Sequence, residues 1–229
     1  MNIKEHFHRG ADLILKYPNE SDIYKEIKFI AENCPIPYYA AHQPHPVKQP
    51  IMNVYFSIMF IKYGWECEPL ASNDSFGDNL RADYRKEFNF EGRPVIVQIE
   101  VEFGNAASYY RDYFKFQLSY FDKKVKIDLG ILICPCNNMS GIMNSGLGDY
   151  QKVVRELPSA KDNMTVPTYV IGLDFDINNI WDLSQETKYI NELGLEKFEA
   201  MIKGNESIEK KDLWSRMTTS YIKSNISNE

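Results

Sequence analysis

The segment Pro94–Phe103, PVIVQIEVEF, limits how this chain can fold more than any other part of it. Apolar β-branched residues dominate the segment, and side chains in a strand point alternately to opposite faces. One face is therefore apolar and suits a core, whereas Gln98, Glu100 and Glu102 lie together on the other face. We expect a strand that ends at Gly104 and holds two acidic side chains in the same direction.

Helical and strand patterns alternate along the rest of the chain. Helices are expected at 11–33, with a break at Pro18-Asn19, and at 51–63, 107–122, 186–203 and 208–224. Strands are expected at 126–134 and 166–174, while the proline-rich segment 35–50 and the polar segment 71–93 are expected to be mostly loop. This order predicts an α/β domain with a central mixed β-sheet flanked by helices.

Length and composition are those of an ordinary globular protein. The 229 residues suit one domain, and 44% of them are hydrophobic while 25% are charged. No apolar run approaches the ~18 residues of a membrane span, and the N-terminus lacks the apolar core of a signal peptide. We therefore expect a single domain over 1–229 in a cytoplasmic protein, with its four cysteines as buried free thiols.

The formal net charge of −6 weighs against a nucleic-acid partner, because neutralising phosphates requires Lys and Arg. Net charge is an average over the molecule, however, and an acidic metal site can coexist with a basic groove. The charge therefore does not exclude nucleic acid.

The acids on the central strand predict a metal site. Glu100 and Glu102 stand two positions apart, so their carboxylates repel each other unless a cation is present. Mg²⁺ prefers carboxylate oxygens, and Asp83 in the preceding RADYRK segment is a third candidate ligand. Acid-ligated metal ions can activate water and stabilise the charge that develops in phosphodiester hydrolysis. The alternative is a solvated strand face whose acids pair with lysines.

Three segments resemble the BamHI and BglII group of type II restriction endonucleases, within the PD-(D/E)xK nuclease superfamily. They are Ala82–Lys86 (ADYRK), Ile99–Asn105 (IEVEFGN) with the downstream Arg111, and the apolar segment 126–135 (KIDLGILICP). Outside them the similarity is patchy and runs from about residue 10 to 175. It implies a restriction-endonuclease-like fold with a catalytic core over about 64–175, and Mg²⁺-dependent cutting of double-stranded DNA.

The resemblance gives the acidic residues distinct roles. Asp83 and Glu100 would ligate the metal ions, together with the main-chain carbonyl of Val101. Glu102 stands where most of the superfamily has Lys, and it would position or deprotonate the attacking water.

Two further sets of residues are less distinctive. The BamHI branch implies another catalytic, metal-binding acid upstream, for which Glu68 is our first choice and Glu66 the alternative, although both also fit surface acids on a loop. His42 and His45 have a spacing that a metal could use, but histidines in loops are usually solvated.

For DNA contacts, the resemblance points to residues just after the catalytic strand and to a later loop. Asn105 and Arg111 match the family after the strand, and Ser108 lies one position from the serine expected there. Asn144 and Ser145 match the BglII side of the group, and both residue types can read base edges in the major groove. The same Asn-Ser-Gly sequence also fits a simple turn.

The resemblance also implies a target and partners. We expect a homodimer that cuts both strands of a short palindrome, with the aromatic helix 107–122 at its interface. The relatives share a central GATC, and Asn144 suits an outer adenine, so A–GATC–T and purine–GATC–pyrimidine are the expected sites, cut to leave 5′ overhangs. A cognate DNA methyltransferase would belong to the same system, with no direct contact implied. The alternatives are a repair or recombination nuclease of the same superfamily, and a DNA-binding protein that has lost catalysis.

Overall fold

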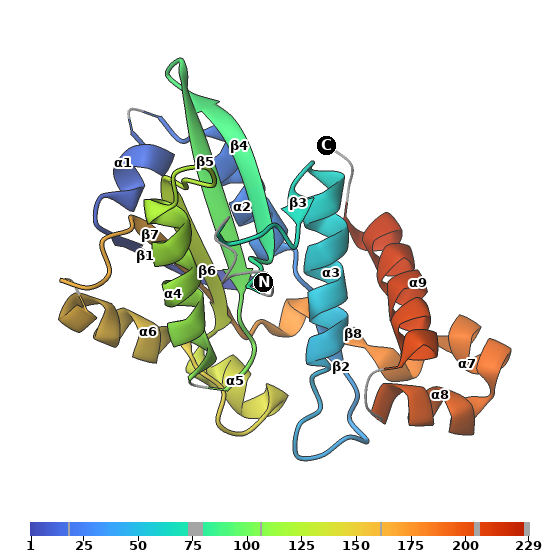
Figure 1. The fold of residues 1–229 in the computed structure, drawn as a ribbon. Helices are drawn as coiled ribbons and strands as arrows, with labels where there is room; N and C mark the ends of the chain where they lie inside the picture. Colours follow the sequence, from blue (N-terminus) through green and yellow to red (C-terminus); the bar gives the residue numbers. More distant parts are fainter. Residues whose placement is uncertain (18, 73–79, 106, 161, 204–206, 227–229) are drawn as a thin grey trace.

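A computed structural model of the protein describes residues 1–17, 19–72, 80–105, 107–160, 162–203 and 207–226. Its centre is a six-stranded sheet with the order β1-β7-β6-β5-β4-β3 (Figure 1). The strands are β1 (Asn2–His8), β3 (Glu66–Cys67), β4 (Tyr84–Phe90), β5 (Arg93–Val101), β6 (Leu129–Pro135) and β7 (Thr168–Asp174). A second, parallel sheet pairs β2 (Ile36–Tyr38) with β8 (Ile180–Asp182).

Helices connect and cover these strands. The α-helices are α1 (Ala11–Leu15), α2 (Asp22–Glu32), α3 (Gln49–Lys62), α4 (Ser108–Phe121), α5 (Asn137–Met143), α6 (Tyr150–Glu156), α7 (Thr187–Leu193), α8 (Leu195–Lys203) and α9 (Ile208–Asn225). Short 3₁₀ turns are η1 (Leu157–Ala160), η2 (Ile177–Asn179) and η3 (Leu183–Gln185).

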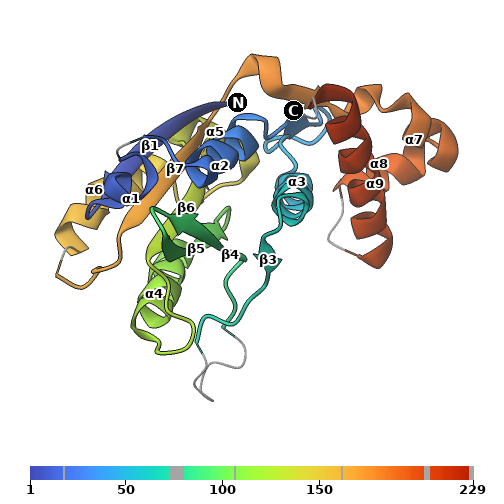
Figure 2. The same ribbon diagram turned by 90° about the horizontal axis from the view of Figure 1, so that it is seen from above.

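The sheet is mixed, and both of its faces are buried. β5, β6 and β7 run parallel, whereas β4 and β1 pair antiparallel at either side of them. Residues such as Val97 and Ile131 pack with α2 and α3 on one face, while Leu132 and Val170 pack with α4 and α6 on the other (Figure 2). β6 is buried along its whole length because it lies between β5 and β7 and under both layers. The predicted fold class is confirmed.

The C-terminal helices α7, α8 and α9 pack in a smaller apolar cluster together with residues of β8 and α3. Trp181 and Trp214 are 6% and 3% exposed within it, and α9 also packs along α3. Figure 1 shows these helices beside α3 and away from the central sheet.

Several features of the structure differ from those predicted from the sequence. The segment 71–93 is not all loop, because β4 occupies Tyr84–Phe90 and turns back into β5 through Glu91 and Gly92, both with positive φ. The predicted helix 186–203 is two helices, since Gly194 has a φ of 80° and separates α7 from α8. Cys67 is exposed on the edge strand β3, unlike the other three cysteines. Residues 73–79 of the predicted loop lie outside the described residues.

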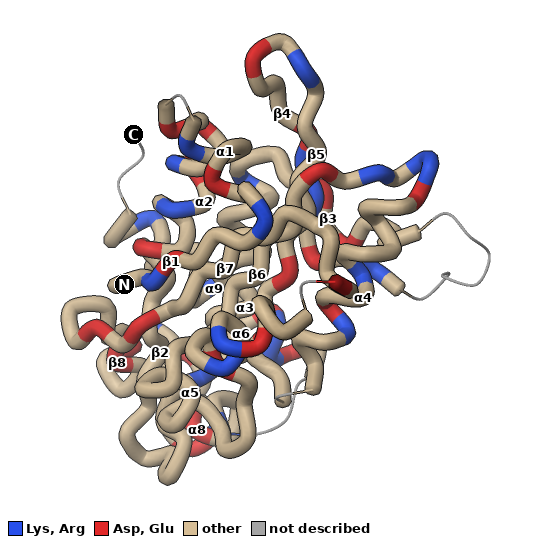
Figure 3. The backbone as a smooth tube through the Cα atoms, turned by 90° about the vertical axis from the view of Figure 1, so that its left-hand side faces the viewer, with Lys and Arg blue, Asp and Glu red and all other residues tan. Residues whose placement is uncertain are grey.

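Basic and acidic residues are interspersed along the described backbone rather than separated onto different elements (Figure 3). The net charge of −6 is therefore spread over the molecule. No helix in the described part of the chain is long and apolar enough to cross a membrane.

Candidate active site

The acidic residues meet where β4 and β5 pass beneath α4. Asp83 immediately precedes β4, and its Oδ2 accepts a hydrogen bond of 2.7 Å from the backbone N–H of Val101 at the end of β5. The antiparallel register that pairs Tyr84 with Ile99 brings these two segments together. The structure thus joins the predicted acids across two neighbouring strands.

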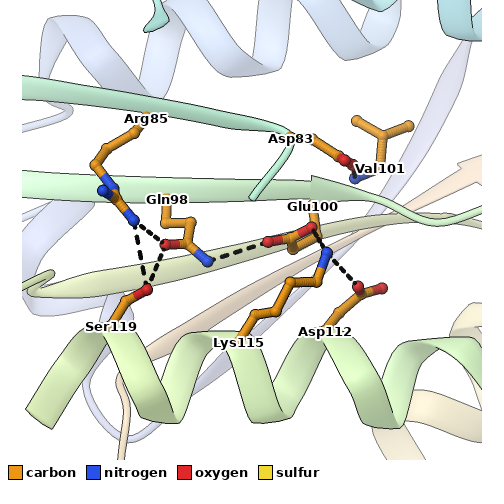
Figure 4. Close-up of polar contacts among 8 residues, drawn as sticks. All are labelled: Asp83, Arg85, Gln98, Glu100, Val101, Asp112, Lys115 and Ser119. Carbon is orange, nitrogen blue, oxygen red and sulfur yellow. Dashed lines mark hydrogen bonds and ion pairs between the residues drawn. The ribbon is translucent and has the colours of Figure 1, made fainter. Parts of the chain in front are cut away.

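Glu100 is 1% exposed, and both of its carboxylate oxygens have partners (Figure 4). Gln98 donates to Oε1 over 3.0 Å, and the ammonium group of Lys115 on α4 donates to Oε2. Lys115 also lies 2.9 Å from Oδ1 of Asp112, one helical turn before it. A buried lysine from the helix therefore links an acid of the strand to an acid of the helix.

A second row of polar contacts holds Gln98 in place. Arg85 Nη2 and Ser119 Oγ each lie 2.8 Å from Gln98 Oε1 (Figure 4). Because the amide oxygen is engaged this way, the amide nitrogen is directed at Glu100. The side chain of Glu100 is consequently fixed from the strand side as well as from the helix.

The group carries more negative than positive charge. Burial and the neighbouring Asp83 carboxylate raise the pKa of Glu100, and burial also raises the pKa of Asp83. Burial alone would lower the pKa of Lys115, but the carboxylates of Glu100 and Asp112 outweigh it and raise that pKa. Each of these shifts reflects a low-dielectric site with a shortage of cations.

Glu102 lies next to Asp112 at the start of α4. Burial and the Asp112 carboxylate raise the pKa of Glu102 to about 7, although the backbone N–H of Gly104 donates to its Oε1 and opposes this. A Cβ on Gly104 would overlap Glu102 Oε1 and lie 2.8 Å from Ser108 Oγ, so a side chain there would displace one or both of these groups. The backbone turn after β5 therefore fixes where the Glu102 carboxylate lies.

The carboxylate oxygens of this cluster are ligands that suit a hard cation such as Mg²⁺. Asp112 Oδ2 is buried and has no hydrogen-bond donor among the described residues, while the acceptor groups of Glu102 lie beside it. Two neighbouring carboxylates in a buried site are stabilised by a shared proton or by a cation. In the part of the chain that the structure describes, no three acidic, His or Cys side chains already converge as a metal site, and the Lys115 ammonium lies among the acids.

Of the two upstream acids, Glu66 is the first residue of β3 and Glu68 follows its last residue. Glu68 is exposed, and it lines the same groove as Asp83 beside α3. Its backbone N–H donates to the Asp83 carbonyl over 2.9 Å, which ties the two positions together. Glu66 lies opposite Arg85 in the strand pairing. Burial lowers the pKa of the Arg85 guanidinium, and the Glu66 carboxylate partly offsets this effect. Of the two, Glu68 is therefore the one placed with Asp83.

The residues expected to contact DNA lie on two adjoining segments. Asn105 forms an antiparallel bridge with Leu147, three positions after Asn144, so the segment that follows β5 touches the later loop. Asn105, Arg111, Asn144 and Ser145 are exposed. The side chain of Asn105 also accepts from the N–H of Ala107 over 2.9 Å, which stabilises the turn into α4.

Asp112 and Lys115 belong to the site but are not predicted from the sequence. They stand three positions apart on the buried side of α4, in a helix otherwise dominated by aromatic residues. Charged residues that interrupt an apolar helical face usually have a buried partner. That interruption was the signal available in the sequence.

Comparisons with known proteins agree with this geometry. The family model described as restriction endonuclease BglII/BglIII matches residues 3–173. Among solved structures, the crystal structure of restriction endonuclease BglII complexed with a DNA 16-mer superposes with a TM-score of 0.61 at 19% identity, covering 77% of this chain and 78% of that one. The crystal structure of free BglII gives a TM-score of 0.51 at 16% identity, covering 77% and 81%. No curated protein sequence matches. The chain belongs to the BglII/BglIII restriction endonuclease family and is a type II site-specific deoxyribonuclease.

Proposed function

We propose that the chain is a Mg²⁺-dependent homodimer that cuts double-stranded DNA at a short palindrome with a central GATC and leaves 5′ overhangs. Asp83 and Glu100 hold the metal, with the Val101 carbonyl and Glu68 as further ligands, and Glu102 acts on the attacking water. The observation that carries this proposal is the buried acidic cluster around Lys115, in which Asp112 Oδ2 has no donor among the described residues.

The chain's own residues prepare the chemistry. Gln98 and the Val101 N–H hold the carboxylates of Glu100 and Asp83 in fixed positions. Glu102 has a pKa of about 7, so it can accept a proton from a water molecule near neutral pH. When bound, Mg²⁺ supplies the positive charge that polarises the scissile phosphate and activates water. With a metal ion bound, Lys115 would either share the carboxylates of Glu100 and Asp112 with it or form other contacts.

Recognition of the target rests on the two adjoining exposed segments. The bridge between Asn105 and Leu147 supports a continuous contact surface that includes Arg111 and Asn144. Arg suits guanine and Asn suits adenine in the major groove. A–GATC–T and purine–GATC–pyrimidine are therefore the proposed sites, and a cognate methyltransferase would protect them.

A dimer places one active site on each strand of a palindrome. The outer side of α4 supports this assembly. Tyr110, Phe114 and Phe121 are 52%, 56% and 67% exposed and lie along one stripe of the helix. Tyr109, Tyr113 and Phe116, in contrast, are buried in the core of the same protomer.

Substitution of the ligand acids tests the proposal. Asp83→Asn and Glu100→Gln keep the size of each side chain and remove its charge, so cutting in Mg²⁺ should fall below detection while duplex DNA still binds. Glu87→Gln, on the exposed part of β4, is the matched control and should cut like the unaltered protein. Cutting by either site variant at the control rate would show that the metal ligands are assigned wrongly.

A further inference from the structure

A second polar site lies outside the acidic cluster, where the segment before α3 meets the C-terminal helices. It is a pocket of about 320 Å³ lined by His42, His45, Lys48, Asn144, Lys203 and Trp214, among others. The N–H of Val47 donates to the Ile142 carbonyl over 3.3 Å and fixes this segment against α5. We call it the basic pocket, after His42, His45, Lys48 and Lys203.

The charged side chains that line the basic pocket are all positive or titratable to positive. No acidic residue is among the described residues that line it. Lys48 is only 7% exposed, yet its ammonium group forms no hydrogen bond or ion pair with a described residue. Burial and the nearby Lys203 lower the pKa of Lys48 to about 8. Lys203 is paired with Glu199 at 2.7 Å, so Lys48 is the cation that an anion would neutralise.

Buried ring nitrogens without partners among the described residues surround the same space. Trp214 is 3% exposed, and its indole N–H, which can only donate, has no acceptor among the described residues. Nδ1 of His45 is also buried without a partner in the described part of the chain. Gln49 and Pro50, at the N-terminus of the 14-residue helix α3, line the pocket too, and the N-terminal end of a helix favours negative charge. The group that these donors suit is an anion rich in acceptor oxygens.

We propose that the basic pocket binds a phosphate group of the DNA backbone, at a distance from the phosphate that is cut. This inference rests on the proposed function, because it takes DNA as the ligand. Two observations favour DNA over a free anion. Asn144, a proposed base contact, lines the pocket itself. Pro50 lines both this pocket and the groove that contains Glu68 and Asp83.

The pocket would then contribute to affinity and register rather than to sequence choice. Phosphate contacts position a protein on the duplex and carry no sequence information directly. The Lys48 side chain is largely buried, so water screens its attraction to a phosphate less than that of a surface lysine. Free inorganic phosphate shares this chemistry, and the test has to separate the two.

The test compares Lys48→Met with Lys25→Met, which removes the same charge from an exposed lysine on α2. Fluorescence anisotropy in Ca²⁺ measures binding to a duplex containing AGATCT and to a scrambled duplex between 50 and 200 mM salt. Each lost phosphate contact reduces the slope of log K against log salt by about 0.9. We expect that reduction for Lys48→Met on both duplexes, and an unchanged slope for Lys25→Met.

Thermal unfolding without DNA provides an independent readout. Because Lys48 is buried without a counter-charge among the described residues, Lys48→Met should unfold at the same temperature as the unaltered protein or higher. A lower unfolding temperature would show that Lys48 has a partner inside the protein and would overturn the inference.

The outcomes separate this inference from the proposed function. If the unaltered protein binds neither duplex, the proposed function fails and the DNA assignment fails with it. If it binds but the two variants have equal slopes, only the basic pocket is wrong. Titration with inorganic phosphate alone, followed through the His42 and His45 ring signals by NMR, completes the test. Binding of phosphate combined with equal slopes would assign the pocket to a free anion and would overturn the DNA assignment.

Discussion

Lys115 on α4 donates to Glu100 on β5, and these side chains are 5% and 1% exposed. An acid predicted to bind a metal thus has a lysine as its partner in the described protein. The lysine compensates the charge of the acidic cluster and must yield part of that role when a metal ion binds. We therefore expect the stability of the protein and its affinity for metal ions to be coupled at this contact.

Removing the lysine should make folding depend on metal. Lys115→Met leaves buried carboxylates without their cation, which costs about 3–5 kcal/mol of unfolding free energy in chelator. Added Ca²⁺ should restore more stability to this variant than to the unaltered protein, as measured by urea unfolding with and without Ca²⁺. Lys28→Met, which removes an exposed partner of Glu32, should cost less than about 1 kcal/mol. Equal responses of the two variants to Ca²⁺ would contradict the coupling.

Glu102 can be tested by restoring the residue that is common in the superfamily. Glu102→Lys places a second ammonium group close to Lys115 and Asp112 and removes the proton acceptor. The cleavage rate should fall by at least about 10²-fold, the lower end of what a general base contributes. Single-turnover cleavage at saturating DNA measures this directly. A rate equal to that of the unaltered protein would remove Glu102 from the mechanism.

A side chain at position 104 should displace the Glu102 carboxylate. In Gly104→Ala the new Cβ would overlap Glu102 Oε1, so the carboxylate must shift. We expect a loss of cleavage with little change in unfolding temperature. Gly141→Ala on α5 is the matched control, because nothing lies within 4 Å of its Cβ, and it should cut normally. Normal cutting by Gly104→Ala would show that the position of Glu102 is not critical.

The exposed stripe of α4 should hold the dimer together. Phe114→Glu places a charge in the proposed interface, whereas Ile177→Glu changes another exposed apolar residue away from α4. Light scattering should give a dimer for the unaltered protein and the Ile177 variant, and a monomer for the Phe114 variant. A monomer in all three, both free and on DNA, would rule out the proposed assembly.

The sequence predicted those parts of the fold in which local pattern and tertiary environment agree. The alternation of apolar and polar faces predicts β5, and nearly continuous apolar runs predict β6 and β7. β1 and β4 escaped prediction because each places a charge on its core side. Glu5 accepts from Tyr24 and Tyr169 over 2.7 and 2.8 Å, and Lys86 pairs with Glu26 at 2.9 Å. Such partners are distant in sequence, so no local pattern reveals them.

The residues of the candidate site also fall into those that local pattern predicts and those that depend on the tertiary fold. Asp83, Glu100 and Glu102 lie on or beside a strongly patterned strand, and the structure brings them together there. Lys115 and Asp112 reach the site only because α4 packs over β5. The direction of a helix across a sheet is a property of the whole fold. The charged residues on the apolar face of α4 therefore indicate buried partners but do not identify them.

Digestion of a long, unmethylated DNA in Mg²⁺, followed by sequencing of the ends, tests the central claim most directly. The unaltered protein should produce discrete fragments, each ending in a four-base 5′ GATC overhang, and Glu100→Gln should produce none. Discrete fragments with other ends would support a site-specific nuclease but would refute the proposed GATC target. A smear would indicate cutting without site specificity. No cutting in Mg²⁺, or equal cutting by Glu100→Gln, would contradict the assignment of the acidic cluster as the catalytic centre.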